Sequence, residues 1–280
     1  LMNGARLGIA AQSVGLSQAA YNEALAYAKD RKQFGKAIIE FPAVAEILSL
    51  MKAKLDASRS LLYETARFVD IYKALDDNAK ERKLTPEERA EQTTFAKLAD
   101  AFTPLGKGMG SEFANQNAYD CIQIHGGSGF MKDYACERIY RDSRITSIYE
   151  GTTQLQVVAA IRYVTTGAYL ARIQEYENMP VAPELEGLQN RLKSMASKYA
   201  ACVTQITEAK DQELLDFCAR RLVEMAAHII MGHLMVQDAS KSDLFSESAQ
   251  VYVRYAEAEV EKHINFIRKF DKDDLAYYRK

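Results

Sequence analysis

The run Tyr149-Glu150-Gly151-Thr152 brings together the residue types of an acid–base site. Glu150 is a lone carboxylate beside a glycine that allows a sharp backbone bend, and the threonine hydroxyl can cap the helix-forming stretch that follows. Free backbone N–H groups lie close to such a loop–helix junction. The pattern favours Glu150 as a general base beside an anionic cofactor or substrate, although an ordinary helix start has the same residues.

A cationic segment follows the expected end of the first helix. Arg31 stands there beside Gln33, Phe34 and a glycine turn. An arginine at this place can complement the helix dipole, or its planar fork can pair with phosphate oxygens. The segment is therefore a second candidate binding site.

A glycine-rich stretch forms the third candidate. Gln123 precedes His125-Gly126-Gly127-Ser128-Gly129. The missing side chains suit a helix–helix turn, and they equally allow a ligand to approach the backbone closely. No strand pattern precedes the stretch, so it is not the dinucleotide fingerprint of a Rossmann fold.

Composition narrows the functional class. The chain has 280 residues, of which 48% are hydrophobic and 26% charged, and its formal net charge is −2. This balance is ordinary for globular proteins, and it offers no broad basic surface for nucleic acid. Several of the five prolines and 14 glycines fall between long helix-periodic segments, which predicts an all-α protein.

The cysteines and histidines show no paired spacing of a metal or redox motif. We expect buried thiols in a reducing compartment and no metal site. The residues concerned are Cys121, Cys136, Cys202, Cys218, His125, His228, His233 and His263.

Hydrophobic periodicity places helices before and after the candidate segments. We expect a polar connection from Asp76 to Glu88, in which Thr85 caps the next helix and Pro86 occupies its first turn. The helices are predicted at about 6–30, 42–75, 86–124, 133–141 and 152–166.

Residues 178–183, with two prolines, are the clearest linker. Beyond them two amphipathic segments keep a heptad rhythm, and a third helix is predicted at about 247–270; each pattern is typical of core packing. We predict domains at 1–178 and 181–280, the second being a small antiparallel helical appendage. No apolar stretch approaches the ~20 residues that span a bilayer.

Four separated motifs in the first 165 residues resemble the C-terminal helical domain of the acyl-CoA dehydrogenase family. They occur in the family's order and spacing, and the match covers residues 1 to about 170. The motifs are Asn3 to Arg6, Tyr27 to Lys36, Gln123 to Phe130, and Tyr140 to Asp142 followed by Tyr149 to Thr152.

The resemblance implies a fold and a reaction. The fold is an antiparallel four-helix-type bundle, and the reaction is FAD-dependent α,β-dehydrogenation of acyl-CoA thioesters to trans-2-enoyl-CoA in fatty acid β-oxidation. Glu150 matches the family's catalytic base. Arg6, Tyr149 and Gly151 match positions at the substrate.

The resemblance also implies which residues hold the cofactor. Arg31, Gln33 and Phe34 would contact the FAD pyrophosphate of a neighbouring subunit. The glycine-rich stretch would bind the adenosine-diphosphate half of FAD. The remaining residues implied at FAD are Gln123, Gly126, Gly127, Thr152 and Gln154.

Several expectations depend on the family as a whole. Its N-terminal helical domain and middle β-domain have no counterpart here, so we expect a C-terminal portion that is inactive alone. Members form homodimers or homotetramers, pass electrons to an electron-transfer flavoprotein, and lie in the bacterial cytoplasm or the mitochondrial matrix. The appendage resembles more loosely the extension of the very-long-chain branch, which accompanies dimers and membrane association. We prefer packing against the parent domain or a second subunit.

Two alternatives stay open at this point. A helical scaffold or assembly protein could keep the fold without the enzyme's role, but the complete Tyr149 to Gln154 run argues against it. A nitroalkane-oxidising relative would resemble the family, but such relatives use aspartate as base. The acyl chain length cannot be read from these residues.

Overall fold

Helices dominate both compact units of the computed structural model, which describes residues 2–279. Unit 1 covers Leu1–Gln156 and unit 2 covers Val157–Lys280. The all-α class predicted from the sequence is confirmed. The predicted division at 178–181 stays a prediction, and a turn between two helices lies there. Among the described residues, no helix combines the length and apolarity that a membrane crossing needs.

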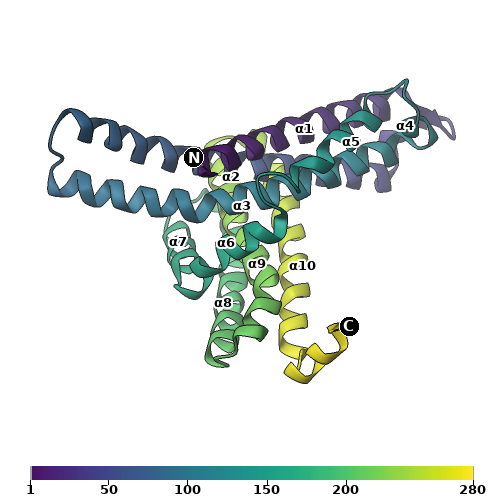
Figure 1. The fold of residues 1–280 in the computed structure, drawn as a ribbon. Coiled ribbons are helices and arrows are strands. Elements are labelled where there is room, and N and C mark those ends of the chain that lie inside the picture. The colour runs from purple at the N-terminus through teal and green to yellow at the C-terminus, as the bar shows by residue number, and fades with distance from the viewer. Residues whose placement is uncertain (1, 280) are drawn as a thin grey trace. The chain divides into compact units, whose positions relative to one another are not determined.

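Unit 1 is built on three long helices that pack on one another, with a shorter helix against two of them (Figure 1). The short helix α5 lies against α1 and α3. The elements are α1 (Met2–Asp30), β1 (Lys32–Gln33), β2 (Lys36–Ala37), η1 (Ile38–Glu40), α2 (Pro42–Glu81), α3 (Pro86–His125), α4 (Gly127–Phe130), α5 (Cys136–Thr146) and the start of α6 (Thr153–Thr165).

Local signals fix the start of α3. Thr85 Oγ1 accepts from the backbone N–H of Glu88 at 3.2 Å, and the Glu88 carboxylate accepts from the Thr85 N–H at 2.9 Å. This capping box and Pro86 in the first turn confirm the predicted start. The predicted start of the polar connection at Asp76 is wrong, because α2 continues to Glu81. The connection is shorter and covers residues 82–85.

A tight antiparallel hairpin separates α1 from α2. Lys32 pairs with Ala37, and Gln33 pairs with Lys36. The two residues between the strands, Phe34 and Gly35, have φ angles of 50° and 85°. Two consecutive residues with positive φ match the turn that suits the twist of a two-residue hairpin. The sequence marked this place only as a helix end.

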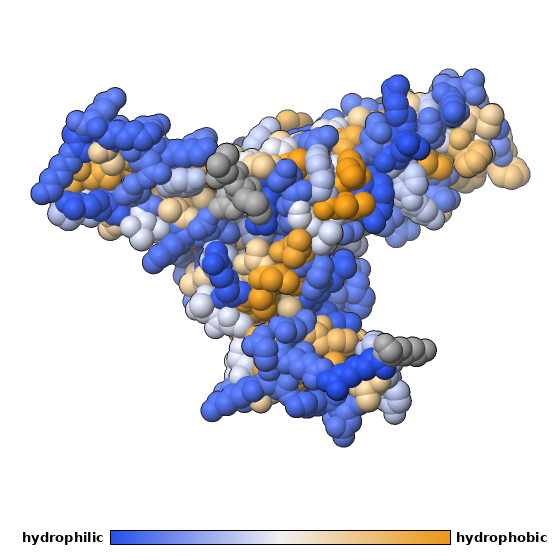
Figure 2. All heavy atoms as spheres, in the orientation of Figure 1, coloured by the Kyte–Doolittle hydropathy of each residue, from blue (hydrophilic) through white to orange (hydrophobic). Residues whose placement is uncertain are grey.

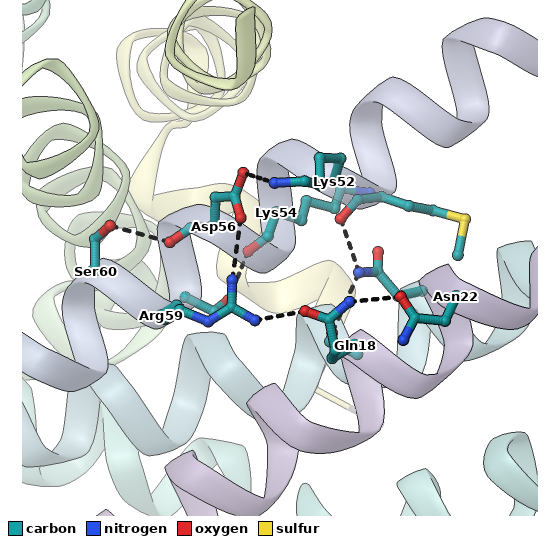
Figure 3. A network of polar contacts seen from close by, with 11 residues as sticks. Gln18, Asn22, Lys52, Lys54, Asp56, Arg59 and Ser60 are labelled. Atoms are coloured by element: carbon teal, nitrogen blue, oxygen red, sulfur yellow. Dashed lines mark hydrogen bonds and ion pairs between the residues drawn. The ribbon is translucent and has the colours of Figure 1, made fainter. Parts of the chain in front are cut away.

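Small residues and one polar network join the long helices. Ala20, Ala24 and Ala28 on α1 are fully buried, which allows the neighbouring helices to lie close. Asp56 on α2 is also buried, and it pairs with Lys52 and with Arg59 at 3.2 Å. Figure 3 shows Arg59 reaching across to α1, where it donates to Gln18 Oε1 at 2.7 Å. The network thus ties α2 to α1.

Helices α2 and α3 extend past the start of α1 and continue there as a pair (Figure 1). Phe68 packs edge-on against Phe102 with ring centroids 5.1 Å apart, which gives this pair a core of its own. Hydrophilic side chains cover most of the tip in Figure 2. Arg82 and Glu88 close the tip through an ion pair.

Unit 2 is a small helical bundle in which α8, α9 and α10 pack on one another and α7 packs on α8 and α9. Its longest helix, α9, begins where Asp211 accepts from two backbone N–H groups. Helix α7 was not predicted: it restarts after Gly167, whose φ of 76° lets the chain turn between two helices. The elements are the rest of α6, α7 (Ala168–Glu177), η2 (Pro183–Leu185), α8 (Glu186–Glu208), α9 (Gln212–Lys241), η3 (Asp243–Phe245), α10 (Ser246–Lys269) and η4 (Lys272–Tyr278).

Candidate active site

Glu150 lies in a sharp turn between α5 and α6, and it is exposed. Its φ angle is 52°, and that of Gly151 is 91°. A left-handed conformation costs a residue with a side chain roughly 1–2 kcal/mol. Such strain persists only where the surroundings hold it, and it gathers at functional positions. The turn therefore has the backbone geometry expected of a site.

Three side chains from other elements hold this turn by its carbonyl groups. Arg6 on α1 donates from Nε to the Glu150 oxygen at 3.4 Å. Lys107 on α3 donates from Nζ to the Gly151 oxygen at 2.6 Å. Gln156 on α6 donates from Nε2 to the same oxygen at 2.9 Å. Arg6 was predicted from the sequence at this place, whereas Lys107 and Gln156 were not.

The side chain of Lys107 is fully buried. Burial lowers the pKa of its ammonium, as does the nearby Arg6 charge, while Glu112 and Glu150 act in the opposite direction. A buried lysine is hard to recognise in a sequence, because lysines mostly lie at the protein surface. The glycines on either side, Gly106 and Gly108, were the available signal of a crowded helix face.

The flanks of the turn are fixed as well. Tyr149 donates its hydroxyl to Gln12 on α1. Thr153 donates to the Glu112 carboxylate at 2.6 Å and its backbone N–H donates to the Ser147 oxygen at 3.1 Å. Within the described residues, the backbone N–H of Glu150 has no acceptor. That N–H is free for a ligand placed beside the carboxylate.

A hollow of about 490 Å³ opens beside the turn. The predicted cofactor residues Thr152 and Gln154 line it together with Tyr140 and Arg144. Thr152 also caps α6, since its hydroxyl accepts from the Leu155 N–H at 3.4 Å. Polar and aromatic groups around an open hollow suit a ligand with flat rings and hydroxyl groups.

The predicted phosphate segment lies at the other end of α1. Arg31, Gln33 and Phe34 are all exposed, and Phe34 is 92% exposed at the hairpin turn. Its ring packs edge-on against Phe41, with centroids 6.3 Å apart, and the rest of it is available to a ligand or to another chain. Arg31 lies just past the end of α1, with its backbone in the hairpin.

The glycine-rich loop adjoins this segment. Gln123 and the two glycines Gly126 and Gly127 are exposed, and Gly126 has φ 59°. A side-chain carbon added at either glycine would meet no atom within 4 Å. Tyr27 on α1 stacks on His125 of the loop at 4.2 Å, so the loop and the end of α1 lie together.

The predicted residues thus form two separate sets. Arg6 and Arg31 stand 25 positions apart on or just after one helix, which at ~1.5 Å per residue puts their backbones about 37 Å apart. Arg31 therefore cannot reach a small ligand that Glu150 of the same chain contacts. The residues around Glu150 and those around the glycine-rich loop of one chain therefore cannot contact the same small ligand.

One cluster was missed from the sequence. Cys121, His125 and Cys136 place their possible ligand atoms within 4.8 Å of one another. Cys121 and His125 are four apart on α3, which was the available signal. Each group already has a partner, since His125 Nδ1 lies 2.8 Å from the Cys121 oxygen and Cys136 donates to the Gly129 oxygen. Burial raises the pKa of both thiols, which favours the protonated form over a metal-binding thiolate.

Two family models match the chain. Residues 1–163 match the family model described as acyl-CoA dehydrogenase, C-terminal domain, and residues 165–275 match one described as acyl-CoA dehydrogenase C terminal. The chain belongs to the acyl-CoA dehydrogenase family. The resemblance inferred from the four motifs is confirmed.

Curated relatives match a little more than half of the chain. The caffeyl-CoA reductase-Etf complex subunit CarC of Acetobacterium woodii is 40% identical over 151 residues, which is 54% of this chain and 34% of the relative. The short-chain specific acyl-CoA dehydrogenase of Clostridium acetobutylicum is 33% identical over 155 residues, 55% of this chain and 35% of the relative. The chain therefore spans about a third of the length of these relatives.

A solved acyl-CoA dehydrogenase structure matches nearly the whole chain. The enzyme of Bacillus anthracis complexed with FAD gives a TM-score of 0.71 at 25% identity and covers 99% of this chain and 50% of that one. The Caenorhabditis elegans protein ACDH-11 in complex with C11-CoA gives 0.70 at 22% identity, covering 91% of this chain and 42% of that one. The second likeness shows the fold alone.

Proposed function

We propose that this chain is the helical C-terminal part of an FAD-dependent acyl-CoA dehydrogenase, in which Glu150 removes the α-proton of the acyl-CoA thioester. The observation that carries the proposal is the strained, exposed Glu150 turn, held by Arg6, Lys107 and Gln156. A base must be held in position to act, and these contacts would hold this one.

The residues of the turn would divide the work. The Glu150 carboxylate accepts the α-proton, and the free Glu150 N–H can donate to the thioester oxygen as negative charge gathers on it. The Arg6 guanidinium adds positive charge beside the same turn. A bound FAD would supply the hydride acceptor for the β-carbon.

The chain offers groups that fit FAD. The glycine-rich loop leaves its backbone open at Gly126 and Gly127, which suits a diphosphate. The exposed Arg31 can pair with phosphate oxygens in bidentate fashion. Thr152 and Gln154 can meet the ring system from the hollow beside Glu150. The FAD bound in the relative from Bacillus anthracis supports this assignment.

We further propose that two chains share each cofactor. Because about 37 Å of α1 separates the Arg6 set from the Arg31 set, one chain would supply Glu150 while a second supplies Arg31, Gln33 and Phe34. A homodimer, or a homotetramer made of two such dimers, satisfies this requirement. Electron-transfer flavoprotein is the proposed electron partner, by analogy with the Etf complex of the Acetobacterium woodii relative.

A second candidate reaction is the reverse one. Two relatives at 40% and 38% identity are a caffeyl-CoA reductase subunit and a 3-(aryl)acrylate reductase. A carboxylate that removes an α-proton in one direction returns it in the other. Glu150 would then protonate the α-carbon of an α,β-unsaturated substrate.

Flavin absorbance separates these candidates. The oxidised full-length flavoprotein is mixed without oxygen with saturated acyl-CoA thioesters, and the reduced protein with unsaturated ones. Bleaching by saturated thioesters supports dehydrogenation, and reoxidation by unsaturated thioesters at a faster rate supports reduction. A protein that carries flavin but responds to neither set would be a non-catalytic paralogue, and the proposal would be wrong.

A further inference from the structure

Lys107 lies in the middle of α3, and its side chain is completely buried. Removing an ammonium from water is costly, so a buried lysine needs a strong compensating contact. Its Nζ donates to the Gly151 oxygen at 2.6 Å, a short bond of the kind that a charged donor makes. This contact joins the middle of α3 to the turn that carries the proposed base.

Helix α3 packs against α1 and the start of α6 near Lys107. A side-chain carbon added at Gly108 would lie 3.6 Å from Gln156, and one at Gly110 would lie 3.8 Å from Ser13. These are ordinary van der Waals distances, so an alanine would fit at either position. The packing on this face brings Lys107 and Gln156 to the same carbonyl of the turn.

The bond falls on the strained part of the turn. Gly151 has φ 91° and follows Glu150 at φ 52°. Its oxygen accepts from both Lys107 and Gln156, and the Gln156 amide also lies 3.4 Å from the Glu150 oxygen. Two donors on the Gly151 oxygen fix the peptide plane that follows Gly151, while Arg6 and Gln156 reach the oxygen of the plane that follows Glu150.

We propose that Lys107 is a positioning residue, which clamps the Glu150–Gly151 turn and sets the aim of the Glu150 carboxylate for proton abstraction. This inference rests on the proposed function of Glu150. The charged groups that act on Lys107 are Arg6 from α1, Glu112 on α3 and Glu150 from the turn. Removing the ammonium therefore changes the electrostatic field at the carboxylate as well as its direction.

The test uses the full-length, flavin-loaded protein and three variants. Lys107→Met removes the clamp and its charge with little change of volume. Gln156→Met removes the second donor but no charge. Lys54→Met is the matched control, because Lys54 is a buried lysine on α2 that lies over the Phe113 ring instead of the turn. Glu150→Gln tests the proposed function separately.

The rate constant of flavin reduction at saturating acyl-CoA should fall about 10–100-fold in Lys107→Met, since small errors in placing a base cost that much. Substrate affinity should change less than about threefold, because the clamp does not touch substrate. The pH at which this rate constant reaches half of its maximum should rise in Lys107→Met and stay unchanged in Gln156→Met, because only Lys107→Met loses a charge. Without substrate, backbone amides of residues 148–153 should exchange about tenfold faster in both.

The inference would be overturned if Lys107→Met kept the wild-type rate of flavin reduction, its pH midpoint and its amide exchange. It would also be overturned if Lys54→Met slowed flavin reduction as much as Lys107→Met does. If Lys107→Met does not fold, Gln156→Met decides: unchanged exchange and rate would refute the clamp. Loss of activity in Glu150→Gln together with a wild-type Lys107→Met refutes the inference alone. Activity retained in Glu150→Gln refutes the proposed function instead.

Discussion

Two buried histidines should make unit 2 sensitive to mild acid. Burial lowers the pKa of His228 to about 4, against the opposing charges of Glu224 and Glu259. Burial also lowers the pKa of His233 to about 4. In the unfolded chain both rings titrate near 6.5. Between these values the unfolded state binds protons that the folded state does not, so stability falls as the pH falls.

The size of the effect follows from this difference. Each ring should remove about 2 kcal/mol from the free energy of unfolding between pH 7 and pH 5, or about 4 kcal/mol for the pair. The loss begins near pH 6.5 and levels off below about pH 4, where both states are protonated. Urea unfolding followed by circular dichroism at several pH values measures it.

A variant separates these rings from other acid effects. No described residue is a hydrogen-bond partner for Nε2 of His233, so His233→Leu removes little that stabilises the fold. The acid-induced loss should then shrink by about 2 kcal/mol. The control Leu234→Ala lowers stability at every pH without changing the slope. An unchanged slope in His233→Leu would refute the reasoning.

Two further substitutions test packing and charge in unit 1. Gly129→Ala should lower the melting temperature of the protein by several degrees, because the added carbon would lie 2.8 Å from the Ile122 backbone oxygen. The control Gly127→Ala places its added carbon in open space and should leave the melting temperature unchanged. Equal melting temperatures of the two variants would contradict this. Asp56→Ala should cost about 1–3 kcal/mol in urea unfolding, because its buried carboxylate holds Lys52 and Arg59, and Arg59 in turn reaches Gln18 on α1. Asp77→Ala, which removes an exposed carboxylate, should lower the stability much less than Asp56→Ala, and equal costs would refute the role of burial.

Local chemistry explains which elements could be predicted from the sequence. The start of α3 was predictable because Thr85, Pro86 and Glu88 carry their signal within four positions. The extension of α2 to Glu81 was not, because exposed pairs such as Lys80 with Asp77 look the same in a loop and on a helix. Helix α7 was missed because Gly167 marks a stop and gives no sign of a restart.

The residues of the candidate site were likewise only partly predictable from the sequence. The sequence motif predicted Glu150 with its glycine and threonine, since these residues are neighbours. Lys107 and Gln12 were invisible, because their roles arise only when distant helices pack together. The separation of Arg31 from Glu150 likewise follows from the length of α1 and from no local pattern.

The central claim is that Glu150 is the base, and one measurement tests it most directly. Glu150→Gln in the full-length flavoprotein keeps the shape of the side chain and removes the proton acceptor. Flavin reduction by acyl-CoA, followed by rapid mixing without oxygen, should slow about 10²–10⁴-fold while flavin content stays unchanged. The control Glu87→Gln, on the exposed start of α3, should reduce at the wild-type rate. Near-normal flavin reduction in Glu150→Gln would contradict the account.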